Sequence, residues 1–272
     1  MYSRCALGVF MSHQEISVPG ATLVVETAGN GEPPLLLLHG LASNRTLWDF
    51  VWDDLAAGRR AIRYDLRGFG GSVAVSDAPF RHSKDLVGLL DALEIERCDI
   101  LGVSLGGSVA LNFALDHPGR IRRLALISPG LTAWEWSDDW RARWRTIVEA
   151  AQAGNICGAR ELWWDHPLFA TARALPAVAE KLQETLQAYS GAIWAEGDRE
   201  EPAMPDLDRL PFLNVPTLLL TGAADLPDFR LIAELVEAAA PDVQRIDYAG
   251  AGHMLNLERP ENVSAEVIKF LA

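Results

Sequence analysis

The chain alternates between short runs rich in apolar and β-type residues and longer segments in which apolar residues recur every three to four positions. The short runs lie at residues 35–38, 61–64, 98–103, 124–127, 215–220 and 243–247, and the first of them is fully apolar. The segments with helical spacing lie at residues 81–93, 105–117, 229–240 and 260–271. Strands that are apolar on both faces and alternate with amphipathic helices are typical of a parallel sheet covered by helices on both sides. The pattern therefore predicts an α/β fold with a mostly parallel, doubly wound sheet.

Two further β-type runs precede the first apolar strand. Residues 15–18 and 22–26 are separated by Pro19-Gly20, which predicts a hairpin. The residues before them carry one arginine and a short apolar patch, without the long apolar region and the cleavage site of a signal peptide. We expect residues 1–14 to form a flexible N-terminal extension, in which Met11 is a second candidate for the initiating residue.

One long segment breaks the alternation. Residues 131–210 have a helical pattern without a clear strand, although strands are expected on both sides of them. Seven of the nine tryptophans lie in this segment: Trp134, Trp136, Trp140, Trp144, Trp163, Trp164 and Trp194. A structureless loop of this length is improbable in a compact domain. We therefore expect a helical cap at 131–210, inserted into a core formed by 15–130 and 211–272.

The overall composition narrows the classes of function. A net charge of −13 argues against nucleic acid, because phosphate binding needs clustered Lys and Arg. Cys5, Cys98 and Cys157 are widely spaced, so they indicate neither a disulfide framework nor a zinc site. No apolar run reaches the roughly 20 residues of a membrane span. We expect a cytoplasmic monomer or homodimer that acts on a small molecule, without a cofactor, a metal, nucleic acid or a membrane.

The sequence around Ser104 carries the clearest chemical signal. Gly102, Ser104 and Gly106 match Gly-x-Ser-x-Gly, and the motif falls where an apolar strand meets a helix. A tight strand-to-helix turn of this kind lifts the serine hydroxyl out of the sheet edge, and the two glycines remove side chains that would collide there. Ser104 is therefore the candidate nucleophile.

A serine hydroxyl needs a base to act at neutral pH, and the base needs an acid that orients it. His253 follows the last expected strand, so it emerges at the same carboxyl edge of the sheet as Ser104. Asp225 follows the strand before it and is the preferred acid. Asp228 is the alternative, although it is equally suited to cap the next helix. The segment after residue 127 reads Ser-Pro-Gly and offers no carboxylate.

Two backbone N–H groups are expected to face the oxyanion of the reaction. One is that of Leu105, directly after the candidate nucleophile, and the other is that of Leu41, in the loop after His39-Gly40. Because both are main-chain donors, the identity of the side chains matters little.

These motifs together resemble the α/β-hydrolase superfamily. Asp-Leu-Arg-Gly-Phe-Gly-Gly-Ser, Gly-Val-Ser-Leu-Gly-Gly, Gly-Ala-Ala-Asp and Gly-His occur in the order that is typical of this family. The resemblance implies a Ser104–His253–Asp225 triad and a variable helical cap. Within the superfamily the chain is similar to small bacterial esterases, enol-lactonases and meta-cleavage C–C hydrolases. A serine at residue 104 argues against the dehalogenases and epoxide hydrolases, which place Asp there.

The tryptophans of the cap have two interpretations. They build the core of the cap, or several of them line an apolar cleft between cap and sheet, where ligands of such folds bind. The residues expected to border this pocket are His39, Trp134, Trp136, Trp140, Trp163 and Trp164.

Three functions remain open on this scaffold. The first is hydrolysis of a small carboxylic ester or lactone whose acyl or alcohol side is apolar or aromatic. The second is cleavage of a C–C bond in a dienone acid, which needs a basic residue such as Arg141, Arg143 or Arg160 to hold the substrate carboxylate. The third is a ligand receptor that retains the triad.

Overall fold

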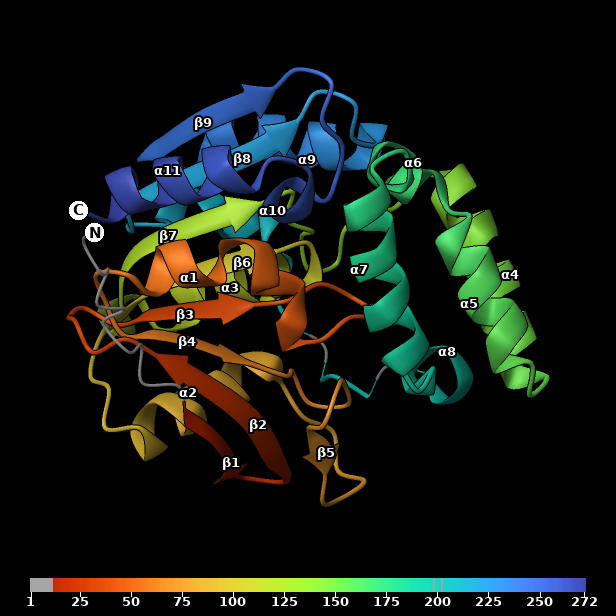
Figure 1. Cartoon of the computed structure of the whole chain (residues 1–272), viewed down its shortest axis with the longest axis horizontal. Coiled ribbons are helices and arrows are strands. Elements are labelled where there is room, and N and C mark those ends of the chain that lie inside the picture. Colours follow the sequence, from red (N-terminus) through yellow and green to blue (C-terminus); the bar gives the residue numbers. More distant parts are fainter. Residues whose placement is uncertain (1–11, 198, 202) are drawn as a thin grey trace, which may run out of the picture.

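The computed structural model describes residues 12–197, 199–201 and 203–272, which form an α/β core and a helical cap (Figure 1). Within these residues the sheet has nine strands in the order β1-β2-β4-β3-β6-β7-β8-β9, with β5 paired to β2. The strands are β1 (Ser12–Val18), β2 (Ala21–Ala28), β3 (Leu35–Leu38), β4 (Ala61–Tyr64), β5 (Val73–Ala74), β6 (Cys98–Val103), β7 (Ile121–Ile127), β8 (Thr217–Gly222) and β9 (Val243–Tyr248).

The sheet is antiparallel at one edge and parallel elsewhere. Strand β2 pairs antiparallel with β1, β4 and β5, whereas the pairs from β4 through β3, β6, β7 and β8 to β9 are all parallel. The expected mostly parallel α/β sheet is therefore confirmed. The ends of the expected strands differ from the observed ones by no more than three residues.

Helices cover both faces of this sheet. Helices α1 and α11 pack together on one face, and α2 and α3 pack together on the other (Figure 1). The helices of the core are α1 (Asp49–Ala56), α2 (His82–Ala92), α3 (Leu105–Asp116), α9 (Pro227–Ala239), α10 (Leu255–Glu258) and α11 (Pro260–Leu271). Among the residues that the structure describes, no helix is both long enough and apolar enough to cross a bilayer.

Strand β1 and helix α1 differ from the sequence-based expectation, and the short β5 and α10 were not expected either. Strand β1 begins at Ser12, so residues 12–14 of the expected extension pair with β2, while residues 1–11 lie outside the described residues. Helix α1 was not expected, although its buried residues Val51, Trp52 and Leu55 have helical spacing. The helix is only eight residues long, which makes its periodicity a weak signal.

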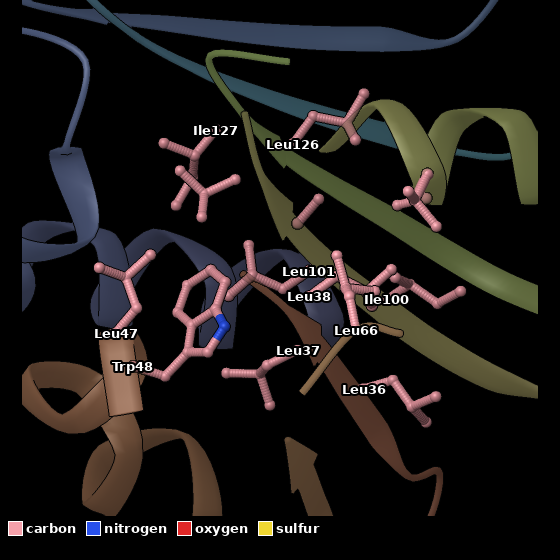
Figure 2. Packing of buried hydrophobic residues seen from close by; sticks show 14 of the residues in the cluster. Leu36, Leu37, Leu38, Leu47, Trp48, Leu66, Ile100, Leu101, Leu126 and Ile127 are labelled. Atoms are coloured by element: carbon pink, nitrogen blue, oxygen red, sulfur yellow. The ribbon is translucent and has the colours of Figure 1, made fainter. Parts of the chain in front are cut away.

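The core lies on both faces of the central strands, against the helices that cover each side. Leucines of β3 belong to one buried cluster with Ile100 and Leu101 of β6 and Ile127 of β7, and the Trp48 ring also belongs to it (Figure 2). All four residues of β3 and all six of β6 are buried. The apolar runs therefore mark strands that are covered on both faces.

The cap lies across the carboxyl ends of the parallel strands (Figure 1). Its helices are α4 (Asp138–Gln152), α5 (Ile156–Trp164), α6 (Ala170–Arg173), α7 (Pro176–Ala188) and α8 (Ala192–Glu196). Helices α4 and α5 contact each other along their length, and α7 contacts the short 3-10 helix η1 (Arg45–Trp48) of the core.

Polar contacts on two sides fasten the cap to the core. At its root the buried carboxylate of Asp206 accepts hydrogen bonds from the Thr132 backbone N–H and from the amide of Asn112 in α3, at 2.7 and 2.8 Å. On the opposite side, Lys181 of α7 forms an ion pair of 2.7 Å with Asp49 of α1. The cap is thus held from two directions.

Helix α3 approaches the sheet more closely than an ordinary side chain allows. A Cβ atom added to Gly106 would lie 2.1 Å from the carbonyl oxygen of Leu38 and 2.6 Å from that of His39. A Cβ atom at Gly102 would lie 2.3 Å from the carbonyl oxygen of Gly106. The first turn of α3 is therefore pressed against the ends of β3 and β6, which is the reason for both glycines.

We predict that Gly106→Ala lowers the free energy of unfolding by about 1–3 kcal/mol or more, because backbone atoms rather than flexible side chains must move to accept the methyl group. Gly119→Ala is the matched control, since nothing lies within 4 Å of its added Cβ atom. Chemical denaturation of the two variants measures the difference. Equal stability of both variants would contradict the close approach.

Candidate active site

Ser104 lies in a strained turn between β6 and α3. Its backbone has φ 54° and ψ −117°, a region that residues other than glycine rarely adopt. The turn is held from both sides, because the Ser104 N–H donates to the Ile127 carbonyl of β7 and the Ser104 carbonyl accepts from the Ser108 N–H, each at 2.9 Å. The serine is thus fixed at the carboxyl edge of the sheet and stays partly exposed.

His253 and Asp225 form a buried pair at the same edge. The Nδ1 atom of His253 lies 2.9 Å from Oδ2 of Asp225, and both side chains are 1% exposed. The other carboxylate oxygen of Asp225 accepts from the Leu226 N–H at 2.7 Å. The Phe229 ring packs on the imidazole with centroids 4.3 Å apart. These contacts orient the imidazole in apolar surroundings.

The Nε2 atom of His253 is buried and has no hydrogen-bond partner among the described residues. His253 and Ser104 line the same small cavity. Buried polar atoms are normally hydrogen-bonded, so an unpaired imidazole nitrogen at a cavity marks a place where a hydroxyl or a ligand can bind. The arrangement offers a base that can accept the Ser104 proton.

Asp228, the alternative acid, is engaged elsewhere. One oxygen accepts from Ser137 Oγ at 2.6 Å, and the other accepts from the Ser137 N–H at 3.1 Å and from the Trp134 indole at 3.3 Å. Asp228 therefore anchors the segment that leads into the cap, and it is Asp225 that the structure brings to His253.

The two expected oxyanion donors lie on either side of Ser104. Leu105 is the first residue of α3, so its N–H has no carbonyl one turn earlier in the helix. Leu41 follows Gly40 in the loop after β3, where a Cβ atom added to Gly40 would come within 3.5 Å of the Ser104 side chain. Both leucines line the large cavity beside Ser104.

His39 shapes this loop and does not line either cavity beside Ser104. Its ring is fully buried between two backbone contacts, with Nδ1 2.8 Å from the Gly40 carbonyl and Nε2 accepting from the Leu66 N–H at 3.0 Å. Burial lowers the pKa of His39 to about 4. The expected place in the pocket wall is therefore corrected to a neutral imidazole that holds two loops together.

Two cavities flank Ser104. The small one has a volume of about 30 Å³ and the large one about 780 Å³. Leu41, Ser104 and Trp163 line both cavities. The large volume is in the range of sites that hold a drug-sized ligand.

Four of the seven cap tryptophans line the large cavity: Trp136, Trp140, Trp144 and Trp163. The rings of Trp136 and Trp140 stack with centroids 4.4 Å apart. Trp164 borders the small cavity. Trp144, which was not among the expected wall residues, therefore joins the pocket, one helical turn after Trp140.

Two tryptophans of the cap have other roles. Trp134 was expected in the wall, but it lines neither cavity and instead donates its indole N–H to Asp228. Trp194 is fully buried and packs against Trp163 and Tyr189. The cap thus uses its tryptophans partly as wall and partly as core.

Of the three arginines proposed to hold a substrate carboxylate, one lines the large cavity. Arg141 lines the large cavity and is paired with Asp138 at 2.5 Å. Neither Arg143 nor Arg160 lines a cavity beside Ser104. Arg143 is paired with Asp139, and Arg160 donates to the Tyr189 carbonyl. Arg145, one turn after Arg141, lines the large cavity and was missed from the sequence.

His166 lies in the cap and contacts the tryptophans of the pocket wall. Its ring packs on Trp140 and Trp163 at centroid distances of 5.0 and 5.4 Å, and its Nδ1 accepts from the Leu168 N–H. Burial, with help from the Arg143 charge, lowers the pKa of His166 to about 4. The imidazole is therefore neutral at pH 7.

Comparisons with known proteins agree with this architecture. The model of the family described as "alpha/beta hydrolase fold" matches residues 33–260. An uncharacterized protein of Mycobacterium tuberculosis is 38% identical over 278 residues, covering 94% of this chain and 80% of that protein. A 2-hydroxymuconate semialdehyde hydrolase of a Pseudomonas species is 36% identical over 137 residues, which is 48% of each chain.

Among solved structures, a thermophilic esterase from Thermogutta terrifontis is similar over nearly the whole chain. The TM-score is 0.80 at 29% sequence identity, and the match covers 96% of this chain and 98% of that one.

We predict that His166→Asn makes the protein less sensitive to acid. Between pH 6.5 and about 4 the unfolded chain binds a proton at His166 that the folded chain does not, so the free energy of unfolding falls as the pH falls. The loss amounts to as much as about 1.4 kcal/mol per pH unit for such a group. Asn can still accept the Leu168 N–H, and its amide does not titrate.

Urea denaturation of the wild type and of His166→Asn at pH 7, 6, 5 and 4.5 measures this difference. The variant should lose less stability over the interval than the wild type does. If the free energies of unfolding of the two proteins fell equally with pH, the pKa of His166 would be the same in the folded and the unfolded chain, which would contradict the prediction.

Proposed function

Because the chain belongs to the alpha/beta-hydrolase family, we propose that it is a serine hydrolase that cleaves a small carboxylic ester through an acyl-enzyme. The observation that carries this proposal is the buried His253–Asp225 pair, whose unpaired Nε2 borders the same cavity as Ser104. Such a pair supplies what a serine hydroxyl lacks at neutral pH, a base held in one orientation.

In the first step Ser104 Oγ attacks the ester carbonyl carbon, and its proton passes to His253 Nε2. The negative charge that develops on the carbonyl oxygen is stabilised by the N–H groups of Leu41 and Leu105. One such donor is worth about 3 kcal/mol in the transition state. The C–O bond then breaks, and the proton on Nε2 moves to the departing alkoxide, which leaves as an alcohol.

In the second step a water molecule takes the place of the alcohol. It gives a proton to His253 Nε2 and attacks the acyl carbon, the proton returns to Ser104, and the carboxylic acid leaves. Asp225 accepts the Nδ1–H of His253 and stabilises the imidazolium in both steps. A lactone would follow the same two steps, with the alcohol still attached to the acyl chain.

The cap is proposed to select the substrate. The large cavity is bordered by four tryptophans and by Phe229, so the group that it receives is apolar or aromatic. The stacked Trp136 and Trp140 form a rigid wall, since neither ring can turn without moving the other.

A second candidate function is C–C bond cleavage in a dienone acid. Two observations favour it. The chain is similar to the 2-hydroxymuconate semialdehyde hydrolase along 48% of its length, and Arg141 and Arg145 line the large cavity. Assaying a ring-cleavage dienone acid beside a panel of p-nitrophenyl esters separates the two. A receptor without catalysis would turn over neither substrate.

We predict that Ser104→Ala folds like the wild type and loses ester hydrolysis by on the order of 10⁴-fold or more. The measurement is turnover of a p-nitrophenyl ester together with labelling by a fluorophosphonate probe, which reacts with activated serines. Ser108→Ala, one turn further along α3, is the control and should keep the label. A Ser104→Ala variant that still hydrolyses the ester at the wild-type rate would refute the assignment.

We predict that Asp225→Asn and Asp228→Asn differ in their effect. Asp225→Asn should reduce kcat by about 10⁴-fold, because an amide cannot hold the imidazole in the required tautomer. Asp228→Asn should retain most of the kcat, since Asp228 contacts Ser137 and Trp134 rather than His253. Steady-state kinetics of the two purified variants decide, and the opposite ranking would make Asp228 the acid.

A further inference from the structure

The two cavities beside Ser104 differ in size by more than an order of magnitude. The small cavity, about 30 Å³, exceeds the roughly 10–15 Å³ that a single water molecule needs on the same measure, so it has room for a small group only. The large cavity, about 780 Å³, can hold a substituent with an aromatic ring. An ester placed with its carbonyl carbon at Ser104 therefore has room for one small and one large substituent.

The position of His253 indicates which cavity receives the alcohol side of the ester and which receives the acyl side. The general acid that protonates the departing oxygen must lie on the leaving-group side of the carbonyl carbon. His253 and the following Met254 line the small cavity and are absent from the walls of the large one. Leu105, whose N–H is the proposed oxyanion donor, lines the large cavity only.

From this asymmetry we infer that the small cavity receives the alcohol side of the ester and the large cavity the acyl side. The preferred substrates are then methyl or ethyl esters of bulky apolar or aromatic carboxylic acids. This inference rests on the proposed serine-hydrolase activity and adds to it the class and the orientation of the substrate.

The polar atoms of the small cavity fit a departing oxygen. Ser43 Oγ and His253 Nε2 are both buried, and neither has a hydrogen-bond partner among the described residues. An alcohol oxygen, or the water that replaces it in the second step, can bond to such groups. The same small volume thus suits both the leaving alcohol and the incoming water.

Two elements that line the small cavity come from opposite sides of it, one from the core and one from the cap. Leu47 comes from η1 of the core, while Leu182, Thr185 and Leu186 come from α7 of the cap, and all four side chains are buried. The ion pair of 2.7 Å between Lys181 and Asp49 joins these two parts. A longer alcohol therefore fits on this side of the cavity only if α7 moves or one of these side chains is shortened.

The first test compares two isomeric esters on the wild-type protein. Methyl 3-phenylpropanoate carries its small group on the alcohol side, whereas 2-phenylethyl acetate carries it on the acyl side. Because they have the same atoms, differences in size and hydrophobicity are nearly removed. We expect kcat/KM of the methyl ester to exceed that of the acetate by at least about tenfold.

The second test lengthens the alcohol and the cavity together. Along the methyl, ethyl, propyl and butyl esters of 3-phenylpropanoic acid, kcat/KM should fall steeply, by about tenfold or more per misfitting methylene. Leu186→Ala should raise the butyl-to-methyl ratio by tens of fold. Leu210→Ala is the control, because Leu210 is also a buried leucine and lines neither cavity.

The possible outcomes separate the two proposals. Preference for the acetate, or equal rates along the alcohol series, overturns the substrate orientation while the serine hydrolase stands. Hydrolysis of none of the esters, together with no fluorophosphonate labelling of Ser104, overturns the proposed function and the orientation with it. If Leu186→Ala is too unstable to assay, the isomer comparison on the wild type still decides.

Discussion

The close approach of helix α3 to the ends of β3 and β6 is the constraint on which the rest of the structure depends. Because Gly106 meets the carbonyl oxygens of Leu38 and His39, the first turn of α3 lies directly against the sheet edge. This approach bends the backbone of Ser104 into a positive-φ conformation and leaves the N–H of Leu105 without a partner inside the helix. The strain is offset by burial of the surrounding strands, where β3 and β6 are covered on both faces.

The apolar surroundings of the site have an electrostatic effect as well as a steric one. His39 and His166 are both neutral because burial disfavours their charged forms, and they bring no positive charge near the imidazole of His253. The Asp225 carboxylate is thus the charge in direct contact with that imidazole. Because both side chains are buried, little solvent screens the interaction between Asp225 and His253.

The sequence predicts the elements whose signal is local. The central strands could be predicted because they are apolar on both faces. Ser104, Asp225 and His253 could be placed at one edge of the sheet because each follows the end of a strand, and their catalytic roles stay a proposal. The walls of the pocket could not be predicted in this way. Trp134 and Trp136 are two residues apart, yet only Trp136 lines the cavity, because the indole of Trp134 is turned to Asp228, a contact that no local sequence pattern reveals.

Two carboxylates with different contacts lie three residues apart after β8, Asp225 in the loop and Asp228 in the first turn of α9. Asp225 holds the imidazole, and Asp228 holds the start of the cap through Ser137 and Trp134. The cap is therefore not an independent module that can be exchanged freely. A chimaera that carries the cap of another hydrolase needs a hydroxyl and an indole at the positions of Ser137 and Trp134. Without them Asp228 loses its donors, and the disturbance reaches the neighbouring loop that positions Asp225, the proposed acid.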